Sequence, residues 1–484
     1  MKARAVFDVF EGSHPGTDSP DQVSRQSWLS LALVSTATFI IILDLMATNV
    51  AFPFIELEFS DTPRSTLAWV SSGNGIAAAA LLLVAGRLGD RYGRRRVFLI
   101  GLAIFTAVSA ITAAAPNPTI LIAARVGQGA GAAMVTSTAI ALLMPLFPPN
   151  KRGLAVGIWG TCASAGAAAG PTLGAIAIEA VDWRWAFLIN VPIGLIVLAL
   201  GRRVLAETER APDSGPIDYL GTVVGTAAIG LLTFGVLQGP RWGWTSGTVS
   251  LALVVSVVLA VAFVVRCDRA ASPLIDLSLF RDRRFALANL SQVGTQLAIN
   301  AWFFTTPLFL INVWGFSALA GGTAVAVGMV VSFVSVPVGH WSDRHGYRGV
   351  LALGGVIAAL GMLVWVFGVD ESPDFWSLYL VGLLLFGLGA GMVGIVVTNA
   401  ALTDLPEHDL GIGNAVFQTV RRLSGAIGVA IAVALIGDRS NESVEAFRGV
   451  WVLIAGGYLF STLAILRYPT SNRQDSVKAI RGRG

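Results

Sequence analysis

The segment after the second apolar stretch of the chain reads Gly86-Arg-Leu-Gly-Asp90-Arg91-Tyr-Gly93-Arg94-Arg95-Arg96. A weaker copy occurs in the second half as Gly339-His-Trp-Ser-Asp343-Arg344-His-Gly346-Tyr-Arg348. Each copy follows the second apolar stretch of a group of six, so both copies lie on the same side of any membrane that these stretches cross. Same-side copies predict two parallel structural halves, related by an axis along the membrane normal.

The residue types in this repeat favour a latch between helices. Glycine permits a tight loop and close helix approach, and Asp90 can accept hydrogen bonds from arginines or cap a helix N-terminus. We therefore predict a gating latch that a conformational change must break. Its residues are Gly86, Asp90, Arg91, Gly93 and Arg94 in the first copy, and Asp343 and Arg344 in the second. The alternative, a basic anchor for orientation, would not need Asp90 and two glycines at this spacing.

Apolar windows of roughly twenty residues, enough helix to cross about 30 Å of hydrocarbon, make up most of the chain. Hydrophobic residues are 55% of the 484 and charged residues only 13%, against about a quarter charged in soluble domains. Fourteen windows are visible, at 28–52, 67–88, 97–115, 119–146, 153–178, 185–205, 217–238, 247–266, 285–312, 318–339, 349–369, 375–402, 411–437 and 446–467. We therefore expect an all-α polytopic membrane protein with fourteen transmembrane helices.

Two long charged connections, 202–218 and 266–284, bracket the seventh and eighth windows. This spacing favours two six-helix bundles with two helices inserted between them. The expected division is a tail over 1–27, an N-terminal bundle over 28–205, a linker with the inserted helices over 206–284, a C-terminal bundle over 285–467 and a tail over 468–484. The first window is too long for a signal peptide, so we expect it to be retained as a helix.

Basic residues predict the orientation. With the N-terminus inside, 25 of the 33 Lys and Arg fall in the tails and connections of the cytoplasmic side, and only five fall on the other side. Cytoplasmic loops carry the excess of Lys and Arg, so both termini are expected in the cytoplasm and the protein in the inner (cytoplasmic) membrane. Because these charges sit at helix ends, the net charge of +4 does not indicate nucleic-acid binding.

Several classes of function are disfavoured by what the chain contains. Its two cysteines and four scattered histidines show no ligand spacing, so no metal site is expected. No phosphate-binding G-x-x-x-x-G-K-[ST] motif occurs, so ATP cannot drive transport on this chain and no cofactor is expected beyond a proton gradient. The sequence shows no nucleophile–base pair, so an enzyme is not expected. The expected partners are a small-molecule substrate, protons and the lipid bilayer. Short tails argue against large partners, and a monomer is expected.

The form G-x-L-x-D-R-x-G-R-R-R resembles a motif of the major facilitator superfamily. Residues 43–53, Leu-Asp-Leu-Met-Ala-Thr-Asn-Val-Ala-Phe-Pro, resemble the first-helix signature of its fourteen-helix drug:proton antiporters, and residues 182–194 and 218–221 resemble the starts of their sixth and seventh helices. The resemblance covers about residues 28–467. It departs at Asn74, where relatives usually carry Tyr, and at Phe309-Leu310-Ile311, so it does not identify the substrate.

Two further segments resemble motifs of this family. Arg125-Val-Gly-Gln128-Gly129-Ala-Gly131 resembles the fourth-helix motif, which implies a role for Arg125 in proton transfer. An Arg tied to backbone carbonyls is the alternative. Gly166-Ala-Ala-Ala-Gly170-Pro171-Thr-Leu-Gly174 resembles the fifth-helix antiporter motif, which is associated with exporters. Small residues four apart let helices approach closely, and Pro171 removes a backbone hydrogen bond and bends the helix.

Asp44 is the clearest acidic residue deep in an apolar window of the first half. An ionisable residue inside a membrane is costly and indicates a functional site. We predict that Asp44, together with Arg125, binds the transported proton or a cationic substrate. The alternative is a structural Asp that is permanently paired.

The ninth window carries Asn289, Gln292, Gln296 and Asn300, spaced three, four and four, so they share one helix face. This polar stripe is unfavourable in lipid and is predicted to line the central cavity, with hydrogen bonding between helices as the alternative. Window thirteen has a similar face in Asn414, Gln418, Arg421 and Arg422, whose arginines can snorkel or pair with acids.

Taken together, these features favour a proton-coupled antiporter that exports hydrophobic or cationic small molecules such as drugs, antibiotics or dyes. A gradient-driven or facilitative importer of a small metabolite is the alternative, which the fifth-helix motif disfavours.

Overall fold

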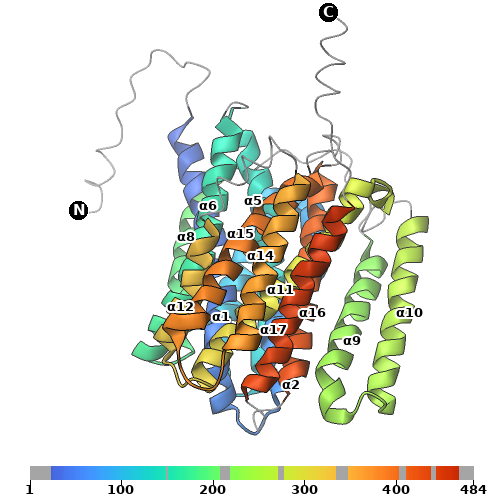
Figure 1. Cartoon of the computed structure of the whole chain (residues 1–484). Helices are drawn as coiled ribbons and strands as arrows, with labels where there is room; N and C mark the ends of the chain where they lie inside the picture. The colour runs from blue at the N-terminus through green and yellow to red at the C-terminus, as the bar shows by residue number, and fades with distance from the viewer. Residues whose placement is uncertain are drawn as a thin grey trace, which may run out of the picture.

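The computed structural model describes residues 23–148, 151–207, 218–270, 277–333, 347–402, 410–437 and 443–467. The regular elements of these residues are helices (Figure 1). Eleven are long and apolar enough to cross a membrane, or twelve if the bent pair Arg64–Leu82 and Val84–Tyr92 is one span. Helix α11, which carries the polar stripe, and the 16-residue α12 lie outside this set. The chain is therefore a multi-span helical membrane protein, while the number fourteen stays a prediction.

The first group of helices runs from α1 (Arg25–Glu58) to α8 (Asn190–Val204). Ser24 caps α1 by accepting from the Ser27 backbone N–H at 3.1 Å, and Asn117 caps α5, whose first residue is Pro118. Both are favoured residues for these positions. The helices are α1 (Arg25–Glu58), α2 (Arg64–Leu67), α3 (Trp69–Tyr92), α4 (Arg94–Ala113), α5 (Pro118–Leu143), α6 (Arg152–Ala180), α7 (Trp185–Leu188) and α8 (Asn190–Val204).

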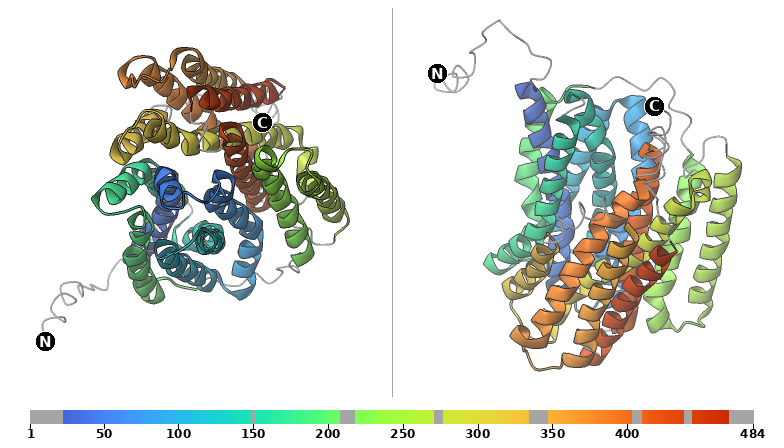
Figure 2. Two further views of the ribbon diagram at one scale, coloured as in Figure 1. Left: turned by 90° about the horizontal axis from the view of Figure 1, so that it is seen from below. Right: turned by 45° about the horizontal axis from the view of Figure 1, so that its top comes forward.

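A hairpin of two helices, α9 (Tyr219–Trp242) and α10 (Gly247–Arg269), stands beside the main bundle (Figures 1 and 2). Its α9 packs against α3 and α16, while α10 packs mainly on α9. Asp218 closes the hairpin, because it caps α9 and accepts from Arg266 Nη2 of α10 at 2.6 Å.

The second group of helices contains α11 to α17. Its members are α11 (Arg283–Asn312), α12 (Ala318–Phe333), α14 (Tyr347–Gly368), α15 (Leu380–Leu402), α16 (Leu410–Ile436) and α17 (Val444–Leu466). A short π-helical turn, Phe375–Tyr379, leads into α15. The start of α1 and the end of α17 lie at the same end of the bundle (Figure 1). The division into bundles and tails, and the cytoplasmic side of the termini, stay predictions.

Among the described residues, the two groups share a hydrophobic core at the end of α1 remote from Arg25. Near the end of α1 remote from Arg25, the rings of Phe52 and Phe304 lie 4.5 Å apart in a core that contains both groups. At the other end, residues such as Val34 and Phe98 form a separate core of the first group alone. The groups are therefore joined at the end remote from the start of α1.

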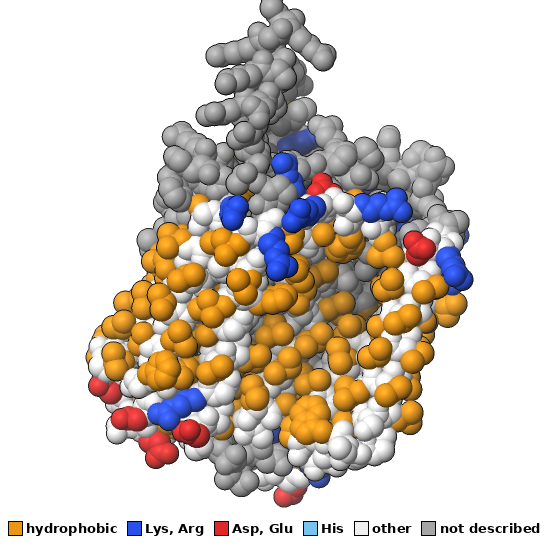
Figure 3. All heavy atoms as spheres, turned by 45° about the vertical axis from the view of Figure 1, so that its right-hand side comes forward, with side chains coloured by type: hydrophobic (Ala, Val, Ile, Leu, Met, Phe, Trp, Pro, Cys, Tyr) orange, Lys and Arg blue, Asp and Glu red, His pale blue; other side chains and the backbone are white. Residues whose placement is uncertain are grey.

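Charge is distributed along the same axis. On the face drawn in Figure 3, Lys and Arg gather at the upper end, and a broad apolar band covers the middle. Several acidic residues lie at the opposite end of this face. An apolar band between two charged rims is the surface expected of a protein in a bilayer.

Candidate functional site

Asp44 of α1 and Arg125 of α5 form an ion pair inside the first group of helices. Arg125 Nη1 lies 2.6 Å from Asp44 Oδ2, and the two side chains are 2% and 0% exposed. The fold thus brings together the two coupling candidates that the sequence separates by 81 positions. Charges this deeply buried are retained only with a close partner and further hydrogen bonds.

The Asp44 carboxylate accepts three N–H groups from three different side chains. Besides Arg125, Gln128 Nε2 donates to Oδ1 at 2.9 Å, and Asn190 Nδ2 donates to the same oxygen at 2.7 Å. Gln128 also donates to Ser109 Oγ of α4 at 2.8 Å. All three partners are donors, so each of them matches an acceptor oxygen of the carboxylate.

Arg125 is also held by the backbone. Its Nε donates to the Val70 carbonyl at 3.0 Å, and its guanidinium lies 5.3 Å from the centre of the Phe187 ring. Asn74 donates to the Arg125 carbonyl at 3.2 Å. Arg125 therefore contacts a carboxylate and a backbone carbonyl at the same time, and its role in proton transfer stays a prediction. Its Nη2 has no hydrogen-bond partner among the described residues.

The glycines of the fifth-helix motif form a seam with α1 on both sides of Asp44. A Cβ at Gly166 would lie 2.6 Å from the Phe39 carbonyl oxygen, and one at Gly170 would lie 2.6 Å from the Met46 Cβ. Gly174 is equally close to Ala47. The small residues therefore set the distance between α6 and the segment of α1 that carries the carboxylate.

On its other side, α6 meets the second group. A Cβ at Gly322 of α12 would lie 2.5 Å from the carbonyl oxygen of Pro171, which lies within α6. Proline at position 171 leaves a carbonyl one turn earlier without its helical donor. The motif thus lies between α1 and α12, and connects the ion pair to the interface between the groups.

The predicted latch forms contacts inside the first group. Arg94 donates to Asp90 Oδ1 from Nη2 at 2.9 Å and to the Ala141 carbonyl of α5 from Nη1 at 3.2 Å. Gly93 has a φ of 102°, a left-handed value that favours glycine. The Glu207 carboxylate packs over Gly93 and accepts from the Arg95 backbone N–H at 3.0 Å, a contact the sequence did not suggest.

The structure also describes Gly86 and Arg91 of the predicted latch. A Cβ on Gly86 would meet nothing within 4 Å, and the Arg91 guanidinium lies 5.6 Å from the Tyr92 ring. The second copy, with Asp343 and Arg344, lies outside the described residues. The gating role of both copies stays a prediction.

The polar stripe of α11 is largely enclosed by protein. Asn289, Gln292 and Gln296 are buried, and Asn300 Nδ2 donates to the Gln296 carbonyl at 2.9 Å. A Cβ on Gly425 of α16 would lie 2.7 Å from Asn300 Nδ2, so this end of the stripe faces α16. The cavity-lining role of the stripe stays a prediction.

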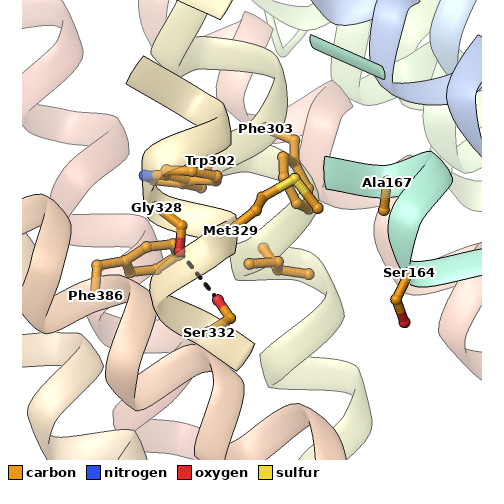
Figure 4. A pocket seen from close by; sticks show the side chains of 9 residues that line it. Ser164, Ala167, Trp302, Phe303, Gly328, Met329, Ser332 and Phe386 are labelled. Atoms are coloured by element: carbon orange, nitrogen blue, oxygen red, sulfur yellow. Dashed lines mark hydrogen bonds between the residues drawn. The ribbon is translucent and has the colours of Figure 1, made fainter. Parts of the chain in front are cut away.

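An apolar cavity of about 140 Å³ lies where α6 meets the second group (Figure 4). Trp302 and Phe386 stack at 4.8 Å along its wall, and Ile299, Phe303 and Met329 add further apolar lining. Ser164 and Ala167 of α6 close it from the first group. The cavity can hold an apolar group of a ligand.

Two contacts that sequence analysis missed join the groups at the end remote from the start of α1. Glu56 and Arg64 form an ion pair of 2.6 Å with both side chains 1% exposed, and Arg64 Nη1 reaches the Gly437 carbonyl at 3.4 Å. Glu179 of α6 accepts from the Leu319 backbone N–H, in the first turn of α12, at 2.7 Å. An acidic residue at a helix N-terminus is stabilising there.

A metal-dependent site is not indicated by this part of the chain. Among the described residues, no group of three or more His, Cys, Asp or Glu side chains could hold a metal ion.

Two helical groups that share a core at one end, with an ion pair inside one group and a cavity between them, define a membrane transport protein. The chain belongs to the Major Facilitator Superfamily, whose sequence model matches residues 34–429 and, in a second match, residues 324–482.

Several relatives are named as antibiotic export proteins or as multidrug resistance proteins. The chain is 36% identical to the cephamycin export protein CmcT of Amycolatopsis lactamdurans, over 88% of this chain and 89% of that protein. It is 34% identical to the multidrug resistance protein Stp of Mycobacterium tuberculosis (strain CDC 1551 / Oshkosh), over 87% and 78%. It is 30% identical to the tetracenomycin C resistance and export protein of Streptomyces glaucescens, over 86% and 77%.

Solved structures share the fold at low identity. The peptide-transporter-family protein PepTSo superposes with a TM-score of 0.68 at 15% identity, covering 93% of this chain and 98% of that one. A bacterial homologue of the human lysosomal transporter Spinster, in an inward-facing and unoccupied conformation, gives 0.65 at 14%, covering 93% and 100%. These likenesses bear on the fold alone.

Proposed function

We propose that this protein is a proton-coupled antiporter of the inner membrane that exports hydrophobic small molecules from the cytoplasm. The buried Asp44 carboxylate, with Arg125 as its counter-ion, is the observation that carries the proposal. Export is supported by the names of the relatives, which include multidrug resistance and antibiotic export proteins.

Coupling would work by exchange of partners at Asp44. While Arg125 is 2.6 Å away, both carboxylate oxygens accept hydrogen bonds from N–H groups. Movement of α1 relative to α5 would separate the charges and leave a buried carboxylate without its counter-ion, a state that takes up a proton. Protonation would then be linked to the position of α1, and the proton would be released when Arg125 returns.

Alternating access would follow from the uneven core. The groups are joined at one end by the Phe52–Phe304 contact and by the hydrogen bond from Arg64 to the Gly437 carbonyl, while the first group has a separate core at the other end. Rocking of one group against the other would open the end where the groups are joined and close the end where they are apart. The apolar cavity beside Trp302 would accept the hydrophobic part of a substrate.

The test is dye transport in proteoliposomes with an imposed pH gradient, comparing wild type with Asp44→Asn. Asn keeps the shape of the side chain but cannot take up the proton. We expect gradient-driven efflux to be lost while exchange of labelled for unlabelled dye, without a gradient, continues. Asp61→Asn, at an exposed position after α1, is the matched control and should keep both activities.

Three outcomes separate the hypotheses. Gradient-driven efflux that survives in Asp44→Asn would remove Asp44 from coupling. Loss of exchange together with a lower unfolding temperature would make the Asp44–Arg125 pair structural. Wild-type transport that ignores the gradient would instead indicate a facilitator, which is the alternative function.

A further inference from the structure

Two consecutive arginines, Arg421 and Arg422, lie inside the apolar helix α16. They fall within its candidate membrane span, Val416–Ile436, about 16 Å along the helix from Leu410. Arg421 is exposed and Arg422 is half-buried. Neither forms an ion pair with an acidic side chain among the described residues. Two positive charges at this depth require a counter-charge or water.

Both arginines lie on the face of α16 that points into the bundle. Residues four apart share a helix face, and Gly425, four residues after Arg421, packs on Asn300 of α11. Ala426, four residues after Arg422, packs on the Gly75 position of α3. Arg421 therefore stays accessible to solvent although it lies on an inward face.

Arg422 lies at the boundary between the two groups of helices. Arg422 Nη2 contacts Thr136 Oγ1 of α5 at 3.5 Å, so it reaches from the second group to the first. The Thr136 hydroxyl already donates to the Ala132 carbonyl at 2.8 Å, which leaves its oxygen as an acceptor. Thr136 is a weak, neutral partner that does not compensate a charge, so the guanidinium groups are available to an anion.

We propose that Arg421 and Arg422 bind the acidic group of a transported substrate, so that the preferred substrates are hydrophobic molecules with a carboxylate or sulfonate. The proposal rests on the proposed export function and narrows its substrate class away from cations. Guanidinium groups suit such acids because they donate in a planar fork that matches the two oxygens. Cationic molecules would be repelled by the same pair.

The test measures equilibrium binding of two dyes that differ in one acidic group, anilinonaphthalene sulfonate and phenylnaphthylamine. Purified protein in phosphatidylcholine nanodiscs is compared with empty nanodiscs, which correct for partition into lipid. We expect wild type to bind the sulfonate about tenfold more tightly than the neutral dye, the ratio expected from one charge-assisted hydrogen bond. The double variant Arg421→Gln/Arg422→Gln should lose this preference and still bind the neutral dye.

Two controls separate charge from structure. Arg421→Lys/Arg422→Lys retains the charge and should retain most of the preference, while Arg203→Gln, at an exposed position in the last turn of α8, should bind both dyes as wild type does. Equal binding of both dyes by wild type would overturn the proposal. So would displacement of the sulfonate by phosphatidylglycerol but by no soluble organic acid, since the site would then hold a lipid.

The transport assay distinguishes failure here from failure of the proposed function. If the pH gradient drives efflux of the neutral dye by both wild type and the double Gln variant, the antiport proposal stands. The binding data then decide the anion preference separately. If no dye responds to the gradient, antiport fails although the anion site can still be present.

Discussion

A methyl group on Gly170 of α6 would come within 2.9 Å of the carbonyl oxygen of Leu43, the residue before Asp44 in α1. Backbone cannot yield as a flexible side chain can, so any side chain at position 170 must push the two helices apart. The position of the carboxylate therefore depends on the absence of a side chain in another helix.

Gly170→Ala is the first prediction. Overpacking of a close contact costs about 1–3 kcal/mol, and the shift of α1 should also lower gradient-driven transport by weakening the Asp44–Arg125 contact. Gly160→Ala is the matched control in the same helix, because a Cβ there meets nothing within 4 Å. Unfolding temperature and dye efflux should both change for Gly170→Ala alone. Equal effects at the two positions would contradict the role of the seam.

Glu56→Gln should lower the free energy of unfolding much more than Glu58→Gln does. Glu56→Gln leaves a buried guanidinium without its carboxylate, which costs about 3–5 kcal/mol. Glu58 pairs with Arg184 at a partly exposed site, so Glu58→Gln should cost less than about 1 kcal/mol. Denaturant unfolding of the two variants in detergent measures the difference. A similar loss in both would mean that burial does not control the strength of the pair.

Gly93→Ala should be destabilising, while Gly86→Ala should be tolerated. Alanine at the φ of Gly93 costs roughly 1–2 kcal/mol, and its Cβ would also displace the Glu207 carboxylate. Gly86 has open space around it. The unfolding temperatures of the two variants measure this difference. If both substitutions are tolerated, the turn at Gly93 can adopt another backbone conformation.

Asp218 should make the stability of the hairpin depend on pH. Burial tends to raise the pKa of this carboxyl, but hydrogen bonds from the Arg266 guanidinium and the Gly221 N–H outweigh it, and the pKa is lowered. A lowered pKa stabilises the folded state above the ordinary value near 4, and this contribution is lost as the pH falls through the lower folded value.

Asp218→Asn should therefore lower the unfolding temperature at pH 7, and the difference from wild type should shrink as the pH falls below about 4. Asp268→Asn, at an exposed position in α10, should show no such trend. A constant difference between Asp218→Asn and wild type at every pH would assign the effect to helix capping rather than to charge.

The apolar windows predicted most helices, because spanning a membrane requires a long run of apolar residues. Helix ends were less predictable. The first window was placed at 28–52, but α1 runs from Arg25 to Glu58, since polar residues at the ends of a membrane helix still complete its backbone hydrogen bonds. Glu56 therefore looked like a residue of a loop, and its pairing with Arg64 was missed.

The site was predictable in its residues but not in its partners. Asp44 and Arg125 were recognisable because ionisable side chains are rare in apolar windows. Their contact depends on how α1 and α5 pack, as do the contributions of Asn190 and Ser109. Glycine spacing likewise predicted a close helix approach, whereas only the structure identifies α1 as the helix approached.

The hairpin of α9 and α10 makes the two lateral sides of the protein unequal. Along the line where α3 meets α16, α9 packs against both helices and stands between them and the surrounding lipid. Where α6 meets α12, neither hairpin helix makes an extensive contact, and the cavity of Figure 4 lies along that line. Acyl chains can thus touch one boundary between the groups directly and are held away from the other, so a solute dissolved in the bilayer meets a protein with a sealed flank and an open one.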